Sequence, residues 1–300
     1  MNAGDLARGR RTWSIKSHEH AVEQFYGAGI QHYHNFNRGH LGFGYDLVGC
    51  PDADYLERAE NLVRQIVDPL GLTSSSKLLS IGFGNGAPEC QVYWEYRPAR
   101  LIGYDVTYVH VKRARERAQR QRIPETRVAF NHGTGTHLPL QDHSMTHAMS
   151  IEVPEHINTR EEFLREMYRV LAPSGRISFS DFALMRDPRG TLEQWAVNFG
   201  AKVWQVPRAN IYGPDTLRAI MEQIGFCNIE IRYVGEYVIP GYYRNHRRLE
   251  MMIGAARVRG FWKGIVGGYI IDRAVYSIFK AGLCEYIIVT ADKPSGARAA

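Results

Sequence analysis

Three glycines and one aspartate are the residues best suited to holding a nucleoside-like ligand. Gly82, Gly84 and Gly86 directly follow an apolar stretch, residues 77–81, and precede a segment of helical character. Glycines at the end of a strand let the backbone turn sharply and approach a ligand closely. Asp105 ends the next apolar stretch, where an acidic side chain in such folds meets ribose hydroxyls. The pattern predicts a nucleoside site, and no Walker lysine follows the glycines, which disfavours a P-loop.

Alternating strands and helices must position these residues. The hydrophobic pattern predicts strands at residues 77–81, 101–105, 128–130, 147–151, 176–180, 229–233 and 285–291. Helices are predicted at 55–67, 108–121, 161–171, 190–204, 214–224 and 242–280, with a turn at 173–175. This alternation is typical of an α/β protein with a mostly parallel, doubly wound sheet, in which 285–291 forms a late edge strand.

Composition and charge favour an ordinary globular protein. Charged residues make up 23% of the 300, and the net charge is +6. The basic run 112–120 has helical spacing and few aromatics, which indicates a solvated helix face rather than a nucleic-acid surface. Four scattered cysteines without a CxxC motif predict no zinc site or disulfide framework, and a cytoplasmic location fits. The most apolar late stretch, 265–279, is interrupted by Asp272 and Arg273, so no membrane span is expected.

Two segments carry a family resemblance. Residues 161–177 resemble the helix, turn and fifth strand of class I S-adenosylmethionine-dependent methyltransferases, and 133–144 resemble the segment that begins with Gly-Asp-Ala in that family. The resemblance covers about residues 60–185 and the final strand. It implies a seven-stranded Rossmann-like core (55–185), an N-terminal arm with an aromatic lid (1–54) and acceptor-cap helices with the last strands (186–300). It implies S-adenosyl-L-methionine as the cofactor, held by Gly82, Gly84, Gly86, Asp105, Val106, Gly133, Thr134 and Ile151.

Thr134 departs from the family pattern, because the family has aspartate there and that aspartate often contacts adenine. Threonine could still accept a hydrogen bond, although more weakly than a carboxylate. The resemblance also places the residues after the fourth strand in the acceptor pocket, and these include Glu152 and His156. His156 could take a proton from a hydroxyl, with Glu152 orienting it or acting as the base. Capping or packing of the next helix is the other interpretation of His156.

Aromatic residues are frequent in the expected lid and cap. The chain has 17 Tyr, 12 Phe and 5 Trp, and aromatic faces stabilise the carbocation that methylation of an alkene produces. Filling of an apolar core is the alternative for each of them. Residues 25–29 and 32–36 resemble the aromatic N-terminal segment of the C-methyltransferases that act on sterol side chains, and a weaker resemblance is to bacterial methylation of a prenyl group. The resemblance implies Tyr26 near the transferred methyl and an isoprenoid or prenylated small-molecule acceptor.

Four alternatives remain at this point. The first is O- or N-methylation of a natural product with His156 as general base. The second is a prenyl diphosphate acceptor clamped by residues 242–248, although no acidic cluster for magnesium accompanies them. The third is an RNA-binding or RNA-methylating protein, which the basic pI near 9.1 would fit. The fourth is an NAD-dependent oxidoreductase. A homo-oligomer is plausible, and no metal or nucleic-acid partner is expected.

Overall fold

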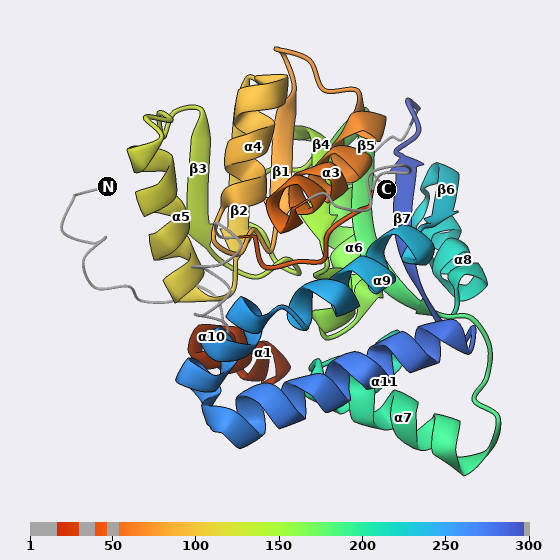
Figure 1. The fold of residues 1–300 in the computed structure, drawn as a ribbon. Helices are drawn as coiled ribbons and strands as arrows, with labels where there is room; N and C mark the ends of the chain where they lie inside the picture. Colours follow the sequence, from red (N-terminus) through yellow and green to blue (C-terminus); the bar gives the residue numbers. More distant parts are fainter. Residues whose placement is uncertain (1–16, 30–39, 47–53, 297–300) are drawn as a thin grey trace.

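The structure, a computed structural model, describes residues 17–29, 40–46 and 54–296 (Figure 1). One sheet has the strand order β3-β2-β1-β4-β5-β7-β6. Its strands are β1 (Lys77–Ile81), β2 (Arg100–Asp105), β3 (Val128–His132), β4 (Met145–Ile151), β5 (Leu171–Leu184), β6 (Cys227–Tyr233) and β7 (Cys284–Asp292). β3, β2, β1, β4 and β5 are parallel, and β7 is antiparallel to both neighbours. The predicted seven-stranded α/β fold is confirmed.

Helices cover both faces of the sheet, and others lie beyond the carboxyl ends of its parallel strands. They are α1 (Ser17–Gly29), α3 (Tyr55–Val67), α4 (Ala87–Tyr96), α5 (Tyr108–Arg120), α6 (Arg160–Val170), α7 (Gly190–Val203), α8 (Pro214–Ile224), α9 (Gly235–His246), α10 (Leu249–Gly260) and α11 (Gly268–Lys280). Single turns occur at η1 (Asp68–Leu70), η2 (Pro154–His156) and η3 (Arg208–Asn210), and a π-helix, η4, spans Phe261–Gly267. Figure 1 shows α1, α7, α10 and α11 gathered beyond the carboxyl ends of the parallel strands.

Side chains that cap the first turn explain where two core helices begin. The Asp54 carboxylate accepts a hydrogen bond from the backbone N of Glu57 at 2.9 Å at the start of α3. The Thr159 hydroxyl accepts one from the backbone N of Glu162 at 3.1 Å at the start of α6. Each bond satisfies an amide that the helix itself leaves without a partner.

The sheet core places the ligand site by its topology. On one face β1 packs through Leu78 against α3, α4 and α5, and on the other Leu79 and Ile81 pack with α6 and α8. β1 lies between β2 and β4, so the chain leaves neighbouring strands toward opposite sides of the sheet. In such sheets ligands bind at the carboxyl ends of the strands beside this switch point.

Three details differ from the expectation. Residues 242–280 form four segments rather than one helix: the end of α9, then α10, the π-helix η4 and α11. Gly260 adopts a φ of +76° that ends α10 before the π-helix begins. The last strand is interior and β6 forms the edge; β7 is buried along most of its length, which fits its apolar run from Tyr286 to Val289. The turn at 173–175 lies within β5, where Ser174 has a φ of +63° and the register with β4 shifts.

Two expectations concern residues that the structure does not describe. The start of the expected N-terminal arm, residues 1–16, and the aromatic segment 32–36 both lie outside the described residues. Within the described part of the lid, residues 17–29 form α1, a helix that the sequence pattern did not predict.

Candidate functional site

A crevice at the carboxyl edge of β1, β2 and β4 brings the predicted cofactor residues together. It is lined by the glycine loop after β1, the end of β2 and the segments that follow β3 and β4. Among the predicted residues, the lining includes Gly82, Gly84, Asp105, Val106, Gly133, Thr134 and Ile151. Gly86 does not line it. The sequence-distant parts of the prediction therefore meet in one place.

The glycine loop is held in a backbone conformation that requires glycine. Gly82 and Gly84 have φ angles of +72° and +53°. A Cβ at Gly82 would lie 2.2 Å from a methyl of Val153, so a larger residue would displace the β4 loop. Gly86 has a φ of +72° at the start of α4, and its Cβ would lie 2.7 Å from that of Ala114. Its part is to let α4 and α5 pack closely behind the crevice.

Asp105 anchors the loop from the neighbouring strand. One carboxylate oxygen accepts a hydrogen bond from the backbone N of Gly84 at 2.8 Å, and the other accepts one from that of Thr107 at 2.8 Å. The His110 ring lies 3.3 Å away. A carboxylate has about four lone-pair positions. Asp105 can therefore hold the loop and still accept hydrogen bonds from hydroxyls in the crevice.

Glu89 is a buried carboxylate in this crevice that the sequence analysis missed. The Ser80 hydroxyl donates to one of its oxygens at 2.7 Å, and the other oxygen has no hydrogen-bond partner in the described part of the chain. Burial raises the pKa of Glu89 to about 8. The available signal was an acidic residue in the first turn of the helix after the glycine loop. A buried oxygen of this kind calls for a cationic or hydrogen-donating ligand group.

Glu19 of α1 was also missed, and it contacts the residue that departs from the family pattern. Thr134 donates a hydrogen bond to the Glu19 carboxylate, and both line the crevice. A carboxylate thus lies beside Thr134, although it comes from the N-terminal helix rather than from the loop after β3.

A second, larger cavity of about 550 Å³ adjoins the crevice. Side chains of α1, α7, α9 and α11 line it together with the end of β5. Tyr26, Leu41, Glu152 and His156 line both spaces and form the boundary between them. The three predicted catalytic residues are therefore at the junction, where a group could pass from one bound molecule to another.

Glu152 is held at this boundary from two sides. It has a φ of +55° directly after β4. Its carboxylate accepts hydrogen bonds from the backbone N of Phe43 at 2.9 Å and from the Tyr286 hydroxyl at 2.7 Å. Burial raises the pKa of Glu152 to about 7, although these two hydrogen bonds oppose the shift. The carboxyl can thus change its charge near neutral pH.

Tyr26 and His156 form a hydrogen-bonded pair. The Tyr26 hydroxyl oxygen lies 2.7 Å from Nε2 of His156. Burial lowers the pKa of His156 to about 4, so its imidazole is neutral at pH 7. Burial and nearby carboxylates, Glu155 first, hold the pKa of Tyr26 well above its usual value. Both side chains are therefore uncharged at neutral pH.

Glu155 is a second buried carboxyl that lines the larger cavity, and the sequence analysis assigned it no role. It is 4% exposed, and burial together with the nearby Asp181 carboxylate raises its pKa well above the usual value. Arg160 is the cation beside it, and its guanidinium is bound by both oxygens of Asp181 at 2.6 and 2.9 Å. Glu152 and Glu155 are therefore the carboxyl groups that line the cavity near the boundary.

Only some of the aromatic residues of the expected lid and cap reach the cavity. Those that line it are Tyr26, Phe43, Trp204, Tyr242 and Tyr269, joined by Phe25 and Phe182. Others contact one another away from it: Tyr45 stacks on Tyr237 with ring centroids 5.2 Å apart, and Trp195 stacks on Phe199 at 5.0 Å. Packing is the simpler role for these latter residues.

The comparisons with known proteins agree with this geometry. The sequence family described as a methyltransferase domain matches residues 79–179. The 27-O-demethylrifamycin SV methyltransferase of Amycolatopsis mediterranei is 30% identical over 196 residues, which are 65% of this chain and 70% of that protein. The chain belongs to the class I S-adenosyl-L-methionine-dependent methyltransferases. Alignments with the first curated relatives span 64 to 70% of the relatives' length.

C-methyltransferases are also among the proteins similar to this methyltransferase. A sterol 24-C-methyltransferase of Pneumocystis carinii is 21% identical over 282 residues, which are 87% of this chain and 73% of that protein. Geranyl diphosphate C-methyltransferase from Streptomyces coelicolor A3(2), solved with Mg²⁺, geranyl diphosphate and S-adenosyl-L-homocysteine, superposes with a TM-score of 0.73. At 15% identity, over 93% of this chain and 98% of that one, the superposition establishes a common fold.

S-adenosyl-L-methionine is the cofactor of this methyltransferase, and the crevice residues fit it. Asp105 offers free lone pairs to ribose hydroxyls, and the buried oxygen of Glu89 suits the ammonium group of the methionine part.

We expect S-adenosylhomocysteine binding to release a proton between about pH 6 and 8, because a cation lowers the raised pKa of Glu89 toward its ordinary value. Calorimetry in buffers of different ionisation enthalpy measures this release. In Glu89→Gln it should disappear; undiminished release would exclude Glu89.

Proposed function

We propose that this methyltransferase transfers the methyl group to an alkene carbon of a prenyl group in a small-molecule natural product. One observation carries the proposal: a buried carboxyl, Glu152, lies at the boundary between the cofactor crevice and a cavity with aromatic walls, and a second, Glu155, lines that cavity. Carboxylates and aromatic faces stabilise a positive charge on carbon, and neither is required for methylation of a hydroxyl.

Bound S-adenosyl-L-methionine supplies an electrophilic methyl group, and its sulfur keeps the electron pair of the bond that breaks. The alkene π electrons form the new carbon–carbon bond and leave a carbocation on the acceptor. Glu152 as the carboxylate, with the ring of Phe182 or Trp204, faces that charge. Loss of a neighbouring proton to the Glu152 carboxylate restores an alkene and balances the charge. The apolar cavity walls exclude the water that would otherwise add to the cation.

O- or N-methylation is the second candidate function, and the rifamycin relative supports it. The observation that favours O- or N-methylation is the 2.7 Å contact between the Tyr26 hydroxyl and Nε2 of His156, a pair that could relay a proton from an acceptor hydroxyl. Against it, the pKa of about 4 makes His156 a weak base toward a hydroxyl. The pair fits better as two neutral groups that shape the boundary.

A prenyl diphosphate acceptor and an RNA substrate are less well supported. Arg244 pairs with Asp46 at 2.8 Å, and Arg247 lies over the ring of Tyr243, so the basic residues of 242–248 do not converge on one anion. Among the described residues no group of three or more His, Cys, Asp or Glu could hold a metal ion. In α5, Arg115 and Arg117 donate to backbone carbonyls of the core rather than forming an open basic surface.

The location and assembly of the protein stay predictions. No helix in the described part of the chain is long and apolar enough to cross a membrane. Cys90, Cys227 and Cys284, the cysteines that the structure describes, are free thiols. The cytoplasmic location, the homo-oligomer and the division at residues 54 and 185 remain proposals.

Turnover against prenylated, phenolic and diphosphate acceptors tests the function, with product masses and NMR locating the new methyl. We expect a new carbon–carbon bond on a prenylated acceptor, and His156→Ala should change that rate by less than about fivefold. A general base contributes about 100-fold or more. A methyl found on oxygen or nitrogen, together with a loss of that size in His156→Ala, would instead support the second candidate.

A further inference from the structure

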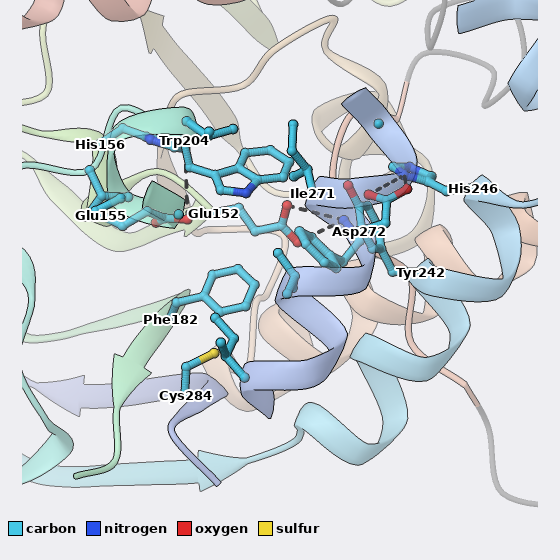
Figure 2. A pocket seen from close by; sticks show the side chains of 18 of the residues that line it. Glu152, Glu155, His156, Phe182, Trp204, Tyr242, His246, Ile271, Asp272 and Cys284 are labelled. Carbon is cyan, nitrogen blue, oxygen red and sulfur yellow. Dashed lines mark hydrogen bonds and ion pairs between the residues drawn. The ribbon is translucent and has the colours of Figure 1, made fainter. Parts of the chain in front are cut away.

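A buried hydrogen-bonded pair, His246 and Asp272, lines the acceptor cavity across from His156 and Glu155. Nδ1 of His246 in α9 lies 3.1 and 3.0 Å from the two carboxylate oxygens of Asp272 in α11. Asp272 is 8% exposed, and both residues line the cavity. Figure 2 shows His156 and Glu155 at one side of the view and His246 with Asp272 at the other, with Trp204 between them. The cavity therefore has two polar ends.

The walls between these ends are apolar. Ile271 and Val275 of α11 line the cavity beside Asp272, and Met251 of α10 adds a further apolar side chain. In a mostly apolar cavity, a few placed polar groups fix the orientation of a ligand. A carboxylate that shares one His N–H still has lone pairs for further donors. The chemistry offered by the pair is therefore acceptance of a hydrogen bond from the ligand.

We propose that Asp272, held by His246, binds a hydroxyl or amine hydrogen-bond donor at the end of the acceptor remote from the reacting alkene. The identity of the reacting end rests on the proposed function, whereas the binding of a donor group by Asp272 does not. This pair determines specificity by orientation: it fixes how far along the cavity the alkene lies and which carbon meets the boundary residues.

An anionic group at this end is disfavoured by the same side chains. It would face the Asp272 carboxylate. The neighbouring cation, Arg247, donates to the Tyr243 hydroxyl at 2.9 Å, and its guanidinium lies 5.1 and 5.2 Å from the ring centroids of Tyr243 and Tyr269. Arg247 also lines the cavity, but its side chain is exposed and held against these rings, so solvent weakens its compensation of the Asp272 charge.

Binding of matched prenyl probes to protein saturated with S-adenosylhomocysteine tests the proposal by calorimetry. The probes are farnesol, farnesyl methyl ether, farnesylamine and geranyl diphosphate. We expect farnesol and farnesylamine to bind about tenfold more tightly than the ether, because the ether lacks the donor and leaves the remaining lone pairs of the buried carboxylate without a hydrogen bond. The farnesol and farnesylamine results distinguish a neutral from a cationic donor. Equal affinities for farnesol and the ether, or tighter binding of the diphosphate, would overturn the proposal.

Substitutions of Asp272 test whether this residue causes the difference in affinity between farnesol and the ether. Asp272→Leu should reduce the farnesol-to-ether ratio to about one while ether binding is kept or improved. Asp272→Asn retains an acceptor oxygen and should keep part of the ratio, and it provides the test if the leucine variant does not fold. The control is Asp215→Asn, which removes an exposed carboxylate outside the cavity and should leave the ratio unchanged. A ratio that survives in both Asp272 variants would contradict the assignment.

These measurements are independent of methyl transfer. If prenylated acceptors are not methylated but the farnesol-to-ether ratio depends on Asp272, the proposed function fails and the donor site stands. If prenylated acceptors are methylated while the ratio is one in the unaltered protein, the function stands and this inference fails.

Discussion

Replacing Asp105 with alanine is expected to weaken S-adenosylhomocysteine binding by about 100-fold while the protein stays folded. Two hydrogen bonds from ribose hydroxyls to a carboxylate would be lost, and each contributes about 1.5 to 3 kcal/mol. The same carboxylate holds the backbone N of Gly84 and of Thr107, so the glycine loop should also become less ordered. Calorimetric titration measures the affinity, and circular dichroism and the melting temperature report the fold.

A control separates this effect from the loss of one negative charge. Asp142 is an exposed carboxylate that pairs with Arg169, away from the crevice, so Asp142→Asn should leave the affinity unchanged. Asp105→Asn keeps one acceptor oxygen and should lie between the alanine variant and the unaltered protein. Unchanged affinity in Asp105→Ala would remove this residue from the cofactor site.

The part of the site that the sequence predicted depends on local pattern. Gly82 and Gly84 follow a strand, and Asp105 ends the next one, so the parallel pairing of β1 with β2 necessarily brings them to one edge. Glu152 and His156 follow β4, and they reach the same edge of the sheet because β4 pairs in parallel with β1 on its other side. Topology converts spacing along the chain into proximity, and this step could be made without a structure.

What the sequence did not predict depends on contacts between distant segments. Glu19 reaches Thr134 only because α1 packs over the crevice, and no periodicity announces that placement. Asp272 was taken as an interruption in an apolar stretch, yet it pairs with His246, which lies 26 positions earlier. The helices that cover the acceptor cavity have no fixed register against the sheet. The spacing of their residues along the chain therefore does not predict which side chains they contact. Burial then sets their chemistry, and burial is a property of the packed fold.

The interior position of β7 could have been predicted, whereas the break within 242–280 was harder to place. Tyr286, Ile287, Ile288 and Val289 are fully buried and occupy both faces of the strand, which is the pattern of an interior strand rather than an edge. Glycines such as Gly260 and Gly264 lower helix propensity, but which one ends the helix depends on packing against neighbouring elements.

Replacing Glu152 with glutamine is expected to lower the methylation rate by about 100-fold and to remove its pH dependence. A neutral amide replaces the carboxylate that faces the developing cation, and removal of one stabilising group of this kind costs about 100- to 1000-fold. In the unaltered protein the rate should rise with pH through about 7, the raised pKa of this carboxyl, because only the ionised form stabilises a cation. The variant should give a flat profile across that range.

Glutamine also permits a test of whether the loss is catalytic or structural. Phe43 and Tyr286 both donate to the same oxygen of Glu152, which glutamine retains, so the boundary should keep its shape.

The folded-state pKa of Glu152 is raised, so its favourable contribution to stability is present at low pH and lost as the pH rises through about 7. Glu152→Gln should therefore be the more stable protein at pH 8, and the difference should vanish by about pH 5. Glu230→Gln, an exposed change on β6, is the matched control. If Glu152→Gln is slow and also less stable at pH 8, Glu152 has a structural role. If the variant is slow but more stable, Glu152 is a catalytic carboxylate whose charge is destabilised by burial.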